Sequence, residues 1–170
     1  QLPGGELQPA MKSGLIDAAE FNNPTPDKDF GMQDVSKHYH LGSFHQSQEC
    51  FEIIFNKSLF NNLNPEHRAI LEYASEAASA DMAWKAMERY SQDLVTLKEK
   101  HGVNVHRTPD SVMQDQLNAW DVVAKRISYD DPFFKKVLES QMAWAKRHGA
   151  YALNNSPNYR GAYEHYFGKM

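Results

Sequence analysis

The sequence predicts an α/β domain that is rich in helix, with a small mixed sheet and one long helix. Two segments alternate apolar and polar residues as strands do, QECFEIIFN at 48–56 and VNVHR at 103–107. A helical pattern runs from Pro65 to about His101. At about 1.5 Å per residue this helix is on the order of 50 Å long, so it braces a scaffold or reaches a partner.

The composition is that of a soluble globular domain. The chain has 170 residues, of which 41% are hydrophobic and 24% charged, and its net charge is −4. That charge argues against a nucleic-acid binder that neutralises phosphates. The single cysteine, Cys50, excludes an internal disulfide and is expected to be a buried thiol. Because the chain opens like the interior of a folded protein, without an initiator Met, we expect further residues upstream.

Short elements are predicted before the long helix. Glu6 favours a helix start, and Gly14 is suited to a helix end. In order, we expect a helix over 6–13, a strand over LIDAAE (15–20), a loop over NNPTPDKD (22–29), a short helix over 29–37 and an extended segment over KHYHLGSF (37–44).

Stronger helix signals follow. Asn64 is a good N-cap with Pro65 at the first helical position, and Thr108 with Pro109 repeats the pattern. Asp130 and Asp131 suit the start of the next helix. The helices are expected over 65–101, 108–128 and 130–153, and an aromatic tail, YRGAYEHYFG at 159–168, is expected to pack in a core or an interface.

No catalytic constellation can be assembled from the residues. His38, His40 and His45 invite a metal site, and strand alternation puts His38 and His40 on one face, but no third ligand stands at a diagnostic spacing. Nucleophile-elbow, P-loop and dinucleotide-binding patterns are absent. We therefore expect a protein that is not an enzyme, in which these histidines are ordinary surface or hydrogen-bonded side chains.

Two strings resemble a known family. PGGELQPAMKSGLIDAAEF, at 3–21, resembles the PGGE-x-x-x-A-x-x-x-G-x-I-D-A-A-E-W segment of the solute-binding subunits of TRAP (tripartite ATP-independent periplasmic) transporters. The stretch 37–74 is similar to the K-Y-Y-x-x-x-G-W-H-E segment and the residues after it in the same family. Together they cover about half of the chain and point to the branch that binds 2-oxo acids.

The resemblance implies a periplasmic type II binding-protein fold, with two α/β lobes, a hinge and a cleft. This chain corresponds to its C-terminal portion. Residues 1–129 are then part of the second lobe with hinge-spanning helices, and 130–170 form a C-terminal helical segment. The family's arginine that pairs with the substrate carboxylate has no counterpart in this chain.

The resemblance also implies a site. The Glu of DAAEW corresponds to Glu20, and the aromatic after it to Phe21. The second metal carboxylate, in G-W-H-E, corresponds to Gln46, or to Glu49 if the alignment slips. An amide oxygen still coordinates a hard cation, but the lost charge makes a divalent ion less favoured. The expected metal residues are Glu20, Phe21 and Gln46, for a Na⁺ or Ca²⁺ ion, and the expected substrate-binding residues are Phe21, Asn22 and Phe44.

By this resemblance the function is that of an extracytoplasmic receptor in the periplasm. It binds a small organic acid, a 2-oxo or 2-hydroxy carboxylate, with a bridging cation, and it delivers this ligand to a TRAP membrane permease. A homodimer through the helix from 131 to 153 is also expected. Two alternatives stay open: a stand-alone α/β interaction or dimerisation module without a small-molecule site, and a metal-dependent enzyme built on the histidines.

Overall fold

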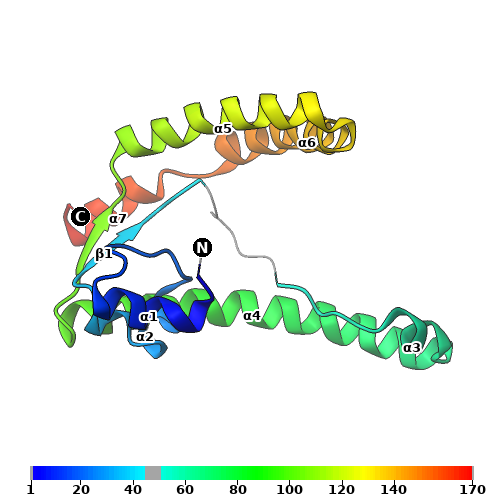
Figure 1. Ribbon diagram of the computed structural model, residues 1–170, viewed down its shortest axis with the longest axis horizontal. Helices are drawn as coiled ribbons and strands as arrows, with labels where there is room; N and C mark the ends of the chain where they lie inside the picture. The colour runs from blue at the N-terminus through cyan, green and yellow to red at the C-terminus, as the bar shows by residue number, and fades with distance from the viewer. Residues whose placement is uncertain (1, 45–50, 170) are drawn as a thin grey trace. The chain divides into compact units, whose positions relative to one another are not determined.

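The computed structural model describes residues 2–44 and 51–169, which form two compact units, Gln1–Met113 and Gln114–Met170 (Figure 1). The first unit contains both strands. In order, the elements are α1 (Gly4–Ser13), α2 (Pro24–Asp29), a 3₁₀ turn η1 (Met32–Asp34), β1 (His38–Leu41), α3 (Lys57–Asn62), α4 (Pro65–Glu99), β2 (Asn104–Arg107), α5 (Asp110–Asp130), α6 (Pro132–Asn155) and α7 (Tyr159–Phe167).

The two strands pair side by side in parallel, with His38 opposite Asn104 and Leu41 opposite Arg107. A parallel pair requires a long crossover connection, and the chain between the strands includes α3 and α4. The α/β class is confirmed, and so are the extended segment over 37–44 and the strand within 103–107. The prediction of a mixed sheet is wrong, because the described residues form a single parallel pair of strands.

The long helix is confirmed. α4 has 35 residues and begins at the predicted signal, since the Asn64 side chain accepts a hydrogen bond from the His67 backbone N–H at 2.8 Å. It ends two residues earlier than predicted, before Gly102, whose φ is +65°. Of its side chains only Asp93 and Leu97 are buried, both near the C-terminal end.

Two short helices were not predicted. NNPTPDKD, expected to be a loop, contains α2, in which Pro24 occupies the first helical position after Asn23. The same Asn-Pro signal marks α4, so the proline was available as a start signal here too. α3 is capped by Asn56, whose side chain accepts from the Leu59 N–H at 3.1 Å. The helix expected over 29–37 is only the turn η1, because α2 ends at Asp29 and Gly31 takes a left-handed conformation, with a φ of +75°, that interrupts a right-handed helix.

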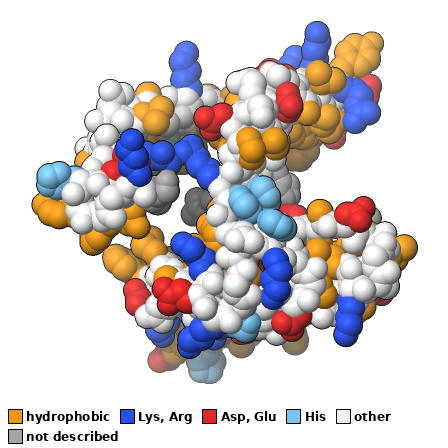
Figure 2. Space-filling view, turned by 90° about the vertical axis from the view of Figure 1, so that its left-hand side faces the viewer, with side chains coloured by type: hydrophobic (Ala, Val, Ile, Leu, Met, Phe, Trp, Pro, Cys, Tyr) orange, Lys and Arg blue, Asp and Glu red, His pale blue; other side chains and the backbone are white. Residues whose placement is uncertain are grey.

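Two predicted strands are wrong. LIDAAE, 15–20, has no regular structure, and neither have residues 51–56 of the second segment; residues 48–50, with Cys50, lie outside the described residues. Phe51, Ile53, Ile54 and Phe55 are instead exposed. An alternating segment becomes a strand only when another strand completes its hydrogen bonds, and no such partner occurs in the described part of the chain. Figure 2 shows hydrophobic side chains lying at the surface.

The second unit is helical. Asp131 caps α6 as expected, since its carboxylate accepts from the N–H groups of Phe133 and Phe134 at 2.8 and 3.1 Å. The aromatic tail forms the helix α7. α5 begins at Asp110, one residue later than the predicted Pro109, and the Thr108 hydroxyl donates to the Leu41 carbonyl at 3.2 Å. Among the described residues, no helix is both long and apolar enough to span a membrane.

A buried carboxylate fastens α2 to α4. The Thr25 hydroxyl donates to Asp93 Oδ2 at 2.6 Å, and Lys28 Nζ lies 2.5 Å from Asp93 Oδ1. The hydrogen bond from Lys28, and then that from Thr25, hold the pKa of Asp93 below its usual range. Ala10, Leu97 and Val103 are buried in the same unit. α2 is therefore anchored by a polar contact beside its own buried Pro24, in a unit where few of the described apolar residues are buried.

We expect Asp93→Asn to lower the free energy of unfolding by about 1–3 kcal/mol at pH 7, because the amide keeps one acceptor but loses the charge-assisted bond. The folded-state pKa of Asp93 lies below its unfolded value, about 3.9, so the unfolded state takes up the proton first as pH falls. The contribution is therefore present above that value and is lost as pH falls through the folded-state pKa. Urea unfolding at pH 7 and pH 3 measures the difference in the free energy of unfolding between the unaltered protein and Asp93→Asn. A difference that is equal at the two pH values contradicts this role of Asp93.

Candidate functional site

The predicted site begins on an arm, residues 15–23, that connects α1 to α2 without regular structure. Gly14 ends α1 with a φ of +74°, and the Leu15 N–H donates to the Ala10 carbonyl at 2.9 Å, so the arm leaves the helix at a fixed angle. Glu20 lies near the end of this arm and is exposed. Within the described part of the chain its carboxylate makes no hydrogen bond or ion pair, which leaves its oxygens available to a cation.

Phe21 packs on the first turn of α1. Its ring centroid lies 4.6 Å from that of Phe30, with the two planes tilted at 55°. A Cβ added at Gly4 would lie 2.9 Å from Cε2 of Phe21, closer than real Cβ atoms approach a neighbour. The PGGE string at the start of α1 is therefore in contact with Phe21, since the missing side chain at Gly4 makes room for the Phe21 ring.

Asn22 is held by its backbone. Its N–H donates to Asp27 Oδ1 at 3.0 Å, and its side-chain oxygen accepts from Asn23 Nδ2 at 3.1 Å. The other carboxylate oxygen of Asp27 accepts from the Tyr39 hydroxyl at 2.7 Å. Burial, and then this bond to Asp27, raise the pKa of Tyr39 above its usual range, so the phenol stays protonated.

The second half of the predicted site follows β1. Phe44 comes after Gly42, whose φ is +91°, and 54% of it is exposed. Gln46, the alternative ligand Glu49, and His45 lie outside the described residues. The structure thus describes Glu20, Phe21 and Asn22 on one arm and Phe44 after β1, and the metal role of Gln46 stays a prediction.

Sequence reasoning missed Asp27, which contacts both segments of the site. It was assigned to a loop, and no motif singled it out. The available signal was Asn23-Pro24, which starts a helix and so places Asp27 within its first turn.

The histidines have a different arrangement from the one expected. His38 Nδ1 lies 3.0 Å from His106 Nε2, and the ring of His40 stacks on that of His106 with centroids 4.9 Å apart. His106, on the neighbouring strand, was not part of the predicted set, and His45 lies outside the described residues. No group of three or more metal-ligating side chains in the described ranges is placed to hold an ion.

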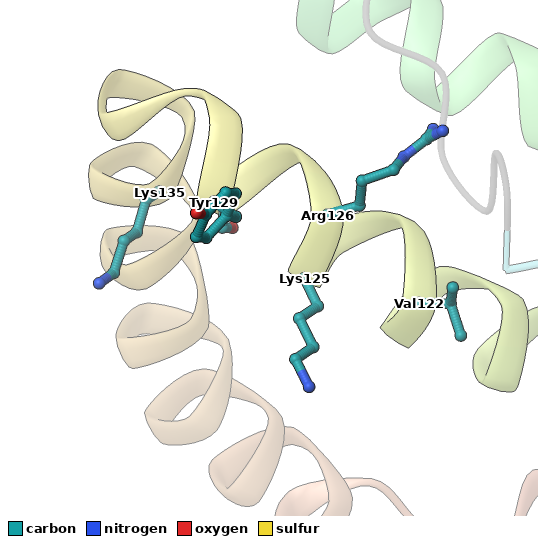
Figure 3. A pocket seen from close by; sticks show the side chains of 6 residues that line it. Val122, Lys125, Arg126, Tyr129 and Lys135 are labelled. Carbon is teal, nitrogen blue, oxygen red and sulfur yellow. The ribbon is translucent and has the colours of Figure 1, made fainter.

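A shallow hollow in the second unit is not the candidate site. It is lined by Val122, Lys125, Arg126, Ser128, Tyr129 and Lys135. Figure 3 shows the charged ends of Lys125, Arg126 and Lys135 pointing in different directions, so they do not converge on one ligand. None of the predicted site residues lines it.

The close approach at Gly4 leads to a prediction with a built-in control. Gly4→Ala should displace the Phe21 ring and change the chemical shifts of the Phe21 and Phe30 ring protons. Gly5→Ala meets no atom within 4 Å and lies in the same helix, so it should leave those shifts unchanged and stabilise the protein by about 0.5–1 kcal/mol. NMR spectra and urea unfolding of both variants measure the two effects. Unchanged ring shifts in Gly4→Ala would refute the packing.

Comparison with known proteins identifies a curated relative and solved structures that resemble this chain. A curated relative from Nostoc sp., described as a monocarboxylate 2-oxoacid-binding periplasmic protein, is 26% identical over 159 residues, which cover 93% of this chain and 43% of the relative. A TRAP periplasmic solute-binding protein from Colwellia psychrerythraea, solved with bound calcium and pyruvate, matches with a TM-score of 0.74 and 26% identity, over 92% of this chain and 50% of that one.

A second solved structure also resembles this chain. A TRAP transporter solute-binding protein from Bordetella bronchiseptica, a mixed-occupancy dimer with copurified calcium and picolinate in one active site, matches with a TM-score of 0.70 and 27% identity, over 91% of this chain and 48% of that one. The chain thus spans about half the length of the proteins it matches, in agreement with the fold expected from the resemblance.

A family model for bacterial extracellular solute-binding proteins, family 7 (DctP), matches residues 1–131. Such proteins bind solutes for transporters and are not enzymes, which confirms the expectation from the sequence and removes the enzyme alternative. The chain belongs to the bacterial extracellular solute-binding proteins of family 7, the solute-binding subunits of TRAP transporters.

Proposed function

We propose that the whole protein is a periplasmic receptor that captures a small 2-oxo or 2-hydroxy carboxylate through a bridging cation and delivers it to a TRAP membrane permease. The observation that carries this proposal is Glu20, an exposed carboxylate without a partner among the described residues, at the end of an arm that is fixed at Phe21 and Asn22. A carboxylate in this position is a hard oxygen ligand, which suits Na⁺ or Ca²⁺.

The ligands of the two structural neighbours support the ligand class. Pyruvate has a keto oxygen next to its carboxylate, and picolinate has a ring nitrogen in the same relation. Both can therefore offer two donor atoms to one cation. We propose that this protein selects carboxylates that carry a donor atom on the adjacent carbon, which includes 2-oxo and 2-hydroxy acids.

In this proposal the cation lies between Glu20 and the ligand, with Gln46 as a further oxygen ligand and with Phe21, Asn22 and Phe44 beside the bound acid. A cation there offsets the repulsion between the carboxylates of Glu20 and the ligand. The family's carboxylate-binding arginine has no counterpart in this chain, so another part of the protein would supply it. The bound ligand then stabilises a closed state by its higher affinity for that state than for the open one.

A homodimer through the C-terminal helical segment, 130–170, belongs to the same proposal. Phe133, Trp144 and Leu153 on α6 are 72%, 55% and 83% exposed, and an apolar surface of this kind favours a protein contact. One structural neighbour is described as a dimer. The same exposure also favours the alternative of an interaction module, which differs from the receptor in binding no small acid.

Calorimetric titration of the intact protein tests the proposal. Pyruvate and lactate should bind in the presence of Ca²⁺ or Na⁺, and propionate, which lacks the adjacent oxygen, should bind more weakly. Glu20→Ala should weaken cation-dependent binding by more than about tenfold, since even residues that only support metal ligands contribute about 10- to 100-fold.

Asp17→Ala is the matched control, because Asp17 is an exposed carboxylate on the same arm. It should bind like the unaltered protein. No binding of any carboxylate, with or without a cation, would refute the receptor and favour the interaction module.

A further inference from the structure

Asp27 connects two segments that are distant in sequence. It is 6% exposed, and its two carboxylate oxygens accept from different partners, Oδ1 from the Asn22 N–H at 3.0 Å and Oδ2 from the Tyr39 hydroxyl at 2.7 Å. Asn22 lies two residues after Glu20 on the arm. Tyr39 lies on β1, the strand that leads to Phe44. One buried side chain therefore touches both segments on which the proposed site is built.

The energetics favour a defined geometry at Asp27. A buried carboxylate is costly unless hydrogen bonds replace its lost hydration, and bonds to a charged acceptor are stronger than neutral ones. Tyr39 stays protonated as the donor, since burial and the neighbouring carboxylate raise its pKa. Displacing either partner would leave part of the carboxylate desolvated without compensation.

The helix that carries Asp27 is itself fixed. Thr25 and Lys28, on either side of Asp27 in α2, are both bonded to Asp93 of α4. Asp27 therefore holds the arm and β1 against α2, and α2 is itself attached to α4, the longest helix of the unit.

We propose that Asp27 is a positioning residue of the binding site: it sets the arm that carries Glu20 and Phe21 relative to the strand that leads to Phe44. This inference rests on the proposed function, because it assigns a role toward the cation and ligand. In this proposal Asp27 is not itself a ligand of the cation or of the acid. It acts through the Asn22 backbone and the Tyr39 side chain, as residues behind metal ligands do in other proteins.

The test compares variants of the intact protein. Asp27→Ala removes both acceptors and should weaken cation-dependent pyruvate binding by about 10- to 100-fold. Asp27→Asn has nearly the same shape, and its amide can still accept from Asn22 and donate to the Tyr39 oxygen, so it should retain most of the affinity. Tyr39→Phe breaks only the link to β1 and should lie between the two. Leu97→Ala serves as the destabilising control, because Leu97 is buried and its side chain takes no part in the hydrogen bonds of Asp27, so its variant should keep the affinity of the unaltered protein.

Two readouts separate positioning from a loss of stability. Exchange of the Asn22 amide hydrogen, measured by NMR without ligand, should be at least about tenfold faster in Asp27→Ala and little changed in Leu97→Ala. In a Glu20→Ala background, Asp27→Ala should weaken cation binding no further, because the ligand that it positions is already gone.

Failure of the positioning role and failure of the proposed receptor function give different results. If the unaltered protein binds cation and pyruvate together while Asp27→Ala binds as tightly, the positioning role is overturned. It is also overturned if Leu97→Ala loses as much affinity as Asp27→Ala. The same holds if Asp27→Ala weakens cation binding in the Glu20→Ala background by as large a factor as it does in the unaltered protein. If the unaltered protein binds no carboxylate, the proposed function fails, and Asn22 exchange alone decides whether Asp27 holds the arm: unchanged exchange in Asp27→Ala overturns that claim as well.

Discussion

The hydrogen bonds that Thr25 and Lys28 donate to Asp93 are the contacts on which the first unit depends most. α2 has only six residues, and a helix of that length is not stable without external contacts. Once α2 is attached to α4, Asp27 is fixed, and through it Asn22 and Tyr39. The exposed Glu20 is thus connected to the long helix by a short series of polar contacts. Few apolar side chains are buried among the described residues of this unit, so these charge-assisted bonds contribute to its local order.

Local signals in the sequence were sufficient for some elements and not for others. Asn64 with Pro65 identified the start of α4, and the pair Asp130 and Asp131 identified the start of α6, because capping depends on residues next to each other. The strands expected at 15–20 and 48–56 depend on partners elsewhere in a sheet, which periodicity cannot supply, and the described residues of both segments are irregular. α2 was missed although it has the same Asn-Pro signal as α4, since two prolines in eight residues suggested a loop.

The candidate site depended on family resemblance more than on residue chemistry. No pattern of residue types in the chain separates Glu20 from the other exposed carboxylates. The structure contributed the physical reasons for the motif: Gly4 leaves room for the Phe21 ring, and Asp27 holds the Asn22 backbone. The Asn23-Pro24 signal places Asp27 on a helix, but sequence spacing does not reveal its role, because that role arises from contacts with residues 5 and 12 positions away in different directions. The described residues also showed that His38 pairs with His106, which a search within one strand could not reveal.

The central claim is that a cation and a carboxylate share one site at Glu20, so that each strengthens the binding of the other. Linkage requires that the coupling be reciprocal. The most direct measurement is the Ca²⁺ affinity of the intact protein, determined without pyruvate and at saturating pyruvate, beside the pyruvate affinity with and without Ca²⁺. The account predicts that pyruvate raises the Ca²⁺ affinity by the same factor by which Ca²⁺ raises the pyruvate affinity. A Ca²⁺ affinity that does not change when pyruvate binds would contradict it.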